Sequence, residues 1–110
     1  MVANNDYAVE ISKKQFENTI NQNEIVVADF FAEWCMPCVM FSPVFEELAQ
    51  KLKGIKFIRI NVDENSELSG KFHVSSIPCV IIFKQGKEAG RTVGAVSAEV
   101  LEEKIKSVSK

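Results

Sequence analysis

Residues 25–38 read IVVADFFAEWCMPC and join two different patterns. The first pattern, Ile25 to Phe31, is apolar apart from Asp29, which is typical of a strand covered on both faces of a sheet. The second pattern places Cys35 and Cys38, with two residues between them, shortly after that strand. Such a pair can close into a small disulfide and reopen. It therefore suits electron transfer between thiols and disulfides better than support of the fold.

The sequence on either side alternates between strand and helix patterns. Period-two alternation or short apolar runs predict strands at 7–11, 58–62, 79–83 and 88–93, the last two joined by a turn at Gln85-Gly86. Apolar side chains three and four residues apart predict four helices. These lie between Ser12 and Asn21, from near Cys35 to Gly54 with a kink at Pro43, over 64–72, and from Ser97 through Val108.

This order, β-α-β-α-β-α-β-β-α, predicts an α/β fold. We expect a mixed central β-sheet flanked by helices on both faces, because each apolar helix face must be buried against the sheet. Right-handed crossovers between parallel strands leave few alternative topologies. No repeat or linker interrupts the pattern, so we expect a single domain over residues 1–110.

Composition narrows the class of protein. The chain has 110 residues and is 46% hydrophobic. Its net charge of -2 argues against nucleic acid or an anionic membrane as its main partner. Its three cysteines are too few for a secreted disulfide scaffold. Residues 1–6 lack the basic and apolar regions of a signal peptide, and no apolar run reaches bilayer length. We expect a cytoplasmic monomer in a reducing compartment.

The predicted fold gives the two cysteines different roles. Cys35 leaves the end of the buried strand where the next helix begins, and the helix N-terminus stabilises a thiolate there. We therefore expect Cys35 to be the more exposed sulfur and the nucleophile. Cys38, one turn into the helix, is expected to be more buried and to resolve the mixed disulfide.

Five segments together resemble the thioredoxin family. They are ADFFAEWCMPC at 28–38, RINVD at 59–63, SIP at 76–78, FKQG at 83–86 and VGA at 93–95. They occur in the family's order and spacing and cover roughly residues 7 to 108. The resemblance implies a thioredoxin-like fold and a protein-disulfide reductase that needs no bound cofactor. It also implies two kinds of partner, a flavin- or ferredoxin-linked thioredoxin reductase and disulfide-containing client proteins.

Further site residues carry over from the resemblance. Asp29 matches the family's buried acid, whose pKa desolvation should raise, and it would accept a proton from Cys38 through a water. Pro78 matches the family's cis-proline, which would leave the Ile77 backbone free to pair with an extended client peptide. The substrate-binding rim would be completed by Trp34, Met36, Pro37, Gly94 and Ala95.

Four positions depart from the usual family pattern. Met36 stands where glycine is most common, and Phe31 replaces a frequent tryptophan. Val39 and Arg59 occupy positions that are often lysine. Because an arginine stays charged, Arg59 should hold the pKa of Asp29 lower than desolvation alone would set it.

Cys79 follows the expected cis-proline and admits two interpretations. It is either a small buried hydrophobe in a strand or a third thiol near the redox pair. As a third thiol it would form an alternative disulfide, or complete a metal or iron–sulfur site with Cys35, Cys38 and His73, although His73 is expected at a surface or helix end. We favour no metal. The alternative functions are a disulfide oxidase or isomerase of the same fold, a non-catalytic binding module, and a metal or cluster carrier.

Overall fold

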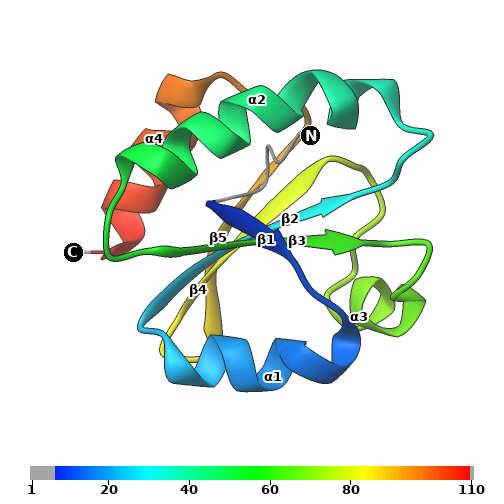
Figure 1. Ribbon diagram of the computed structural model, residues 1–110, viewed down its shortest axis with the longest axis horizontal. Helices are drawn as coiled ribbons and strands as arrows, with labels where there is room; N and C mark the ends of the chain where they lie inside the picture. The colour runs from blue at the N-terminus through cyan, green and yellow to red at the C-terminus, as the bar shows by residue number, and fades with distance from the viewer. Residues whose placement is uncertain (1–6, 110) are drawn as a thin grey trace.

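The structure, a computed structural model, describes residues 7–109 and contains the expected order of elements (Figure 1). The expectation about a signal peptide concerns residues 1–6, which lie outside the described part of the chain. The elements are β1 (Ala8–Glu10), α1 (Lys13–Gln22), β2 (Ile25–Phe31), α2 (Met36–Lys51), β3 (Lys56–Asn61), α3 (Ser66–Lys71), β4 (Cys79–Lys84), β5 (Lys87–Val93) and α4 (Ala98–Ser109).

The five strands form one mixed sheet in the order β1-β3-β2-β4-β5. β1 and β2 both pair in parallel with β3, whereas β4 runs antiparallel to β2 and β5 antiparallel to β4. All seven residues of β2 are buried, which confirms the expectation from its apolar sequence. The predicted mixed sheet is therefore confirmed, and β2 is its central strand.

Helices cover both faces of the sheet, as Figure 1 shows, with α2 and α4 on one side and α1 and α3 on the other. Each face has its own apolar cluster. Phe41 and Phe45 of α2 pack with Leu101 and Ile105 of α4 against one face. On the other face, α1 and α3 contribute Phe16, Ile20 and Leu68. No helix within residues 7–109 combines the length and apolar character that a bilayer crossing requires.

Local contacts explain where the helices begin and end. The Ser12 N–H donates to Oε1 of Gln15 at 3.0 Å, and the Val100 N–H donates to Oγ of Ser97 at 3.2 Å, so both expected N-terminal caps are present. The expectation that Gly54 caps α2 is wrong by two residues. The cap is Leu52, whose N–H donates to the Leu48 carbonyl, while Gly54 occupies the following turn with φ 84°.

Several element boundaries also differ from the prediction by one or two residues, and the starts of β3 and α3 each differ by two. β3 begins at Lys56 rather than at residue 58, because its pairing with β2 starts at that residue opposite Val26. α3 begins at Ser66 rather than at residue 64. Asn65 directly precedes this helix, and its side-chain amide donates to the Asn61 carbonyl at 2.9 Å. This contact links the start of the helix to the end of β3.

The register of the strands brings the ends of β2, β3 and β5 and the start of β4 to the same end of the sheet. Phe30, near the end of β2, pairs with Cys79, the first residue of β4. Cys79 pairs in turn with Val93, the last residue of β5. Phe31 pairs with Asn61, the last residue of β3. The segments that follow β2, β3 and β5, and the one that precedes β4, therefore meet at this end of the sheet.

Candidate active site

Cys35 and Cys38 form a disulfide at the start of α2, with their Cα atoms 5.2 Å apart. Cys35 is the N-cap residue of this helix, and its Sγ accepts a hydrogen bond from the Cys38 N–H at 3.2 Å. The exposed fractions are 5% for Cys35 and 1% for Cys38, so both cysteines are buried and Cys35 is the more exposed. An N–H and the positive end of a helix dipole thus face the Cys35 sulfur, where they favour a thiolate.

The segments before β4 and after β5 lie beside this disulfide. The Ile77–Pro78 peptide bond is cis, and the Ile77 carbonyl oxygen lies 3.8 Å from Sγ of Cys35. The Gly94 N–H donates to the Pro78 carbonyl at 2.8 Å, which links the two segments. Gly94 has φ 93°, a conformation that favours glycine, so this link depends on the residue type. The sheet register therefore places Ile77, Pro78 and Gly94 near Cys35.

The surface around the disulfide is apolar and open. Trp34, Met36, Pro37 and Ala95 are exposed, Ile77 is half-buried, and Pro78 is buried beneath them. Trp34 is held in place because its Nε1–H donates to Oδ2 of Asp63 at 2.7 Å. Sequence reasoning missed this role of Asp63, since no local pattern pairs residues 29 positions apart.

Asp29 lies completely buried in the central strand, beside Arg59 of β3. The closest atoms of the pair, Arg59 Nε and Asp29 Oδ2, are 3.7 Å apart, and neither carboxylate oxygen has a hydrogen-bond partner. The Arg59 guanidinium instead stacks over the Phe31 ring, with its Cζ 4.2 Å from the ring centroid. Two of the departures from the family pattern, Phe31 and Arg59, are therefore in contact with each other.

Burial raises the pKa of Asp29 to about 7, and the charge of Arg59 opposes this rise. Both directions are those expected from the sequence. A pocket of about 310 Å³ lies beside Arg59, the neighbour of Asp29, and is also lined by Cys38 and Ser42. A volume of this size is large enough to hold several waters.

Cys79 does not share the apolar cluster of the Cys35–Cys38 disulfide. It packs in the cluster under α1 and α3, whereas Cys35 and Cys38 belong to a separate cluster with Phe31 and Ala32. Arg91 Nη1 lies 4.0 Å from its sulfur. A metal site built on Cys79 would need further ligands, yet residues 7–109 hold no group of three or more His, Cys, Asp or Glu side chains suited to a metal ion. His73 is exposed just after α3, as expected.

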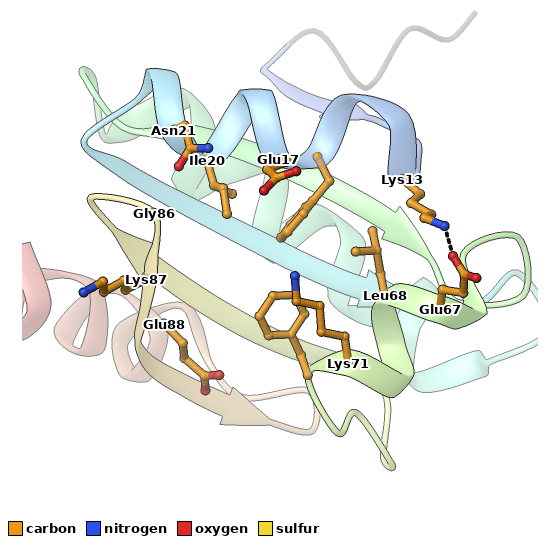
Figure 2. A pocket seen from close by; sticks show the side chains of 12 residues that line it. Lys13, Glu17, Ile20, Asn21, Glu67, Leu68, Lys71, Gly86, Lys87 and Glu88 are labelled. Carbon is orange, nitrogen blue, oxygen red and sulfur yellow. Dashed lines mark ion pairs between the residues drawn. The ribbon is translucent and has the colours of Figure 1, made fainter.

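A larger hollow of about 490 Å³ lies away from the disulfide, between α1, α3 and the β4–β5 turn. Figure 2 shows the Lys13–Glu67 ion pair at its edge. Glu88, also on its rim, binds Arg91 through both carboxylate oxygens, and Lys71 lies over the Phe72 ring. No cysteine lines it, so it is separate from the redox chemistry.

The fold and the reactive pair define a class of protein, a domain that exchanges thiols and disulfides at a helix N-terminus. Comparison with known proteins narrows this class. The family model described as Thioredoxin matches residues 7–107. Thioredoxin of Chlamydia pneumoniae is 45% identical over 91 residues, covering 83% of this chain and 88% of that protein. Thioredoxin of Mycoplasmoides gallisepticum is 38% identical over 95 residues, covering 86% and 95%.

Solved structures agree with these relatives. A mutant thioredoxin from Halobacterium salinarum superposes with a TM-score of 0.89 at 30% identity, covering 100% of this chain and 97% of that one. Oxidized mitochondrial thioredoxin 3 from Saccharomyces cerevisiae gives a TM-score of 0.87 at 30% identity, covering 96% and 99%. The chain belongs to the thioredoxin family. It is a thiol–disulfide oxidoreductase of the protein-disulfide reductase type, with its cysteine pair at disulfide distance.

The raised pKa of Asp29 predicts that stability depends on pH. Between its ordinary value of 3.8 and about 7, the folded chain holds a proton that the unfolded chain has released. The free energy of unfolding should therefore fall as pH rises across this window, by about 4 kcal/mol at roughly 1.4 kcal/mol per pH unit.

Urea unfolding of the oxidised protein at a series of pH values measures this slope. The Asp29→Asn variant should lack it, whereas Glu47→Gln, which replaces an exposed carboxylate, should keep it. Parallel curves for the native protein and Asp29→Asn between pH 4 and 7 would contradict the assignment.

Proposed function

We propose that Cys35 is the attacking nucleophile and Cys38 the resolving thiol in the reduction of client protein disulfides. The main support for this assignment is the start of α2, where the Cys38 N–H donates to the Cys35 sulfur at 3.2 Å. In the reduced state the same N–H and the helix dipole stabilise a thiolate on Cys35. Cys38 lies deeper in the fold than Cys35, which is the N-cap residue of the helix.

The reaction proceeds in two exchanges. The Cys35 thiolate attacks one client sulfur, the client S–S bond breaks, and the other client sulfur leaves as a thiolate. Cys38, as its thiolate, then attacks Sγ of Cys35 in the mixed disulfide, and the first client sulfur leaves. The client gains two electrons, and the pair ends as the Cys35–Cys38 disulfide seen in the structure.

Asp29 is proposed as the group that accepts the Cys38 proton. Its pKa of about 7 leaves a substantial ionised fraction at neutral pH, so it can both take up and release a proton there. Its carboxylate oxygens make no hydrogen bond, and its neighbour Arg59 lines the same pocket as Cys38. A water in that pocket would complete the proton path. The positive charge of Arg59 favours the ionised form of Asp29.

Client binding is proposed at the apolar surface around the disulfide. Ile77 offers backbone groups beside Cys35, where an extended peptide could add as a short strand. The proposed client rim consists of the exposed or half-buried residues Trp34, Met36, Pro37, Gly94 and Ala95. Apolar side chains suit many clients, because burial of their surface requires no fixed hydrogen-bond pattern.

The proposal includes partners that keep the cycle running. A flavin- or ferredoxin-linked thioredoxin reductase would reduce the Cys35–Cys38 disulfide after each turn in the cytoplasm. A solved structure 31% identical to this chain concerns thiol resolution in a yeast mitochondrial 1-Cys peroxiredoxin through the glutathione and thioredoxin systems. A peroxiredoxin is accordingly a suitable first protein client to test.

The assigned roles predict opposite behaviour of two matched variants. Cys38→Ser should accumulate a covalent mixed disulfide with a client, because attack occurs and resolution does not. Cys35→Ser should form none above background, because Cys38 is the more buried sulfur. Non-reducing gels and intact mass of each variant, mixed with an oxidised client, give the readout. Equal trapping by both variants, or trapping by Cys35→Ser alone, would overturn the assignment.

A second prediction concerns the proton acceptor. Asp29→Asn should slow resolution of the mixed disulfide at neutral pH by on the order of 100-fold, the usual contribution of a general base. Stopped-flow release of a labelled client thiol measures this step, with Glu47→Gln as the control for loss of a surface carboxylate. If Asp29→Asn resolves at the native rate and with the native pH profile, Asp29 is not the acceptor.

A further inference from the structure

Two of the chain's three methionines lie beside the disulfide on α2. Met36 is 65% exposed and Met40 69% exposed. They are four residues apart, so both thioethers lie on the same face of the helix. Val39, next to Met40, is also exposed, and Trp34 lies just before the helix. Met40 therefore extends the apolar client rim from Met36 along the exposed face of α2.

The other sulfurs of the described chain are protected in the oxidised protein. Cys35 and Cys38 are bonded to each other. Cys79 is buried, and its burial raises the pKa of the thiol, which keeps it from forming the reactive thiolate. Within residues 7–109, the thioethers of Met36 and Met40 are thus the sulfur atoms most open to an oxidant in solvent.

We propose that Met36 and Met40 form a modification site at which hydrogen peroxide or an organic hydroperoxide produces methionine sulfoxide and thereby weakens client binding. The thioether sulfur attacks the distal peroxide oxygen, and a sulfur–oxygen bond forms as the O–O bond breaks. The sulfur loses two electrons, the proton on the transferred oxygen passes to the other peroxide oxygen, and that oxygen leaves as water or an alcohol. The consequence for clients rests on the proposed function of the rim, whereas the modification itself does not.

The expected effect follows from what the oxygen does to the surface. Methionine is a flexible apolar side chain, and its sulfoxide is polar. A client that packs on the rim would have to strip water from the new S=O group without offering it a donor, which is unfavourable. Met36 directly follows Cys35, so a client peptide joined to Cys35 passes close to this group. Oxidised rims should therefore capture clients more slowly, with the cysteine pair still intact.

The test compares each protein with itself before and after peroxide. The disulfide form is treated with hydrogen peroxide, the peroxide is removed with catalase, and peptide mass spectrometry locates the added oxygen. The rate of client reduction is then measured with dithiothreitol as the electron source, alongside dithiothreitol reduction of the Cys35–Cys38 disulfide itself. The control is the Met36→Leu, Met40→Leu double variant, which keeps apolar side chains of similar size and retains Met1 and Cys79.

The expected result is oxygen on Met36 and Met40 and none on Cys79. Client reduction by the native chain should fall about fivefold, the effect of losing one good contact in an interface. Dithiothreitol reduction of the pair should be unchanged, and the double variant should retain its own untreated rate.

Three results would overturn the proposal. They are no sulfoxide at either methionine, sulfoxide without a slower client rate, and an equal fall in the double variant. Failure of the proposed function is distinguishable, because an untreated native chain that reduces no client would show it while the mass measurement still reports the modification.

Discussion

The pairing of β2 with β3 on one side and β4 on the other is the constraint on which the site depends. Hydrogen bonds on both edges and apolar side chains on both faces hold this strand in one register. A slip of one residue would turn Asp29 toward the opposite face and move Cys35 away from Ile77. The same two ladders therefore position Cys35, Asp29 and the segment that contains Ile77 and Pro78.

The site combines a stabilised sulfur with a destabilised carboxylate. The N-terminus of α2 favours negative charge at Cys35, while burial disfavours it at Asp29. Arg59 limits the second effect without forming a close hydrogen-bonded pair, because its guanidinium stacks on Phe31. The two opposed environments support the separate roles proposed for Cys35 as nucleophile and for Asp29 as proton acceptor.

The order of the elements and the mixed sheet followed from local patterns, because strong alternation and apolar periodicity report burial directly. Cys35, Cys38 and Asp29 were also readable from the sequence, since a cysteine pair and a lone acid stand out against an apolar strand. The Trp34–Asp63 hydrogen bond and the Phe31–Arg59 stack were not, because they join strands and loops distant in the chain. The placement of Cys79 away from the pair likewise depended on which face of β4 it occupies.

The central claim is that Cys35 and Cys38 act as a reversible, reducing dithiol. An equilibrium titration against a dithiothreitol series, followed by the fluorescence of Trp34, the only tryptophan, tests it directly. The account predicts a single two-electron transition at a strongly reducing potential, near the value of about −270 mV typical of thioredoxin. A midpoint at about −180 mV or higher, in the range of isomerases and oxidases, would contradict it.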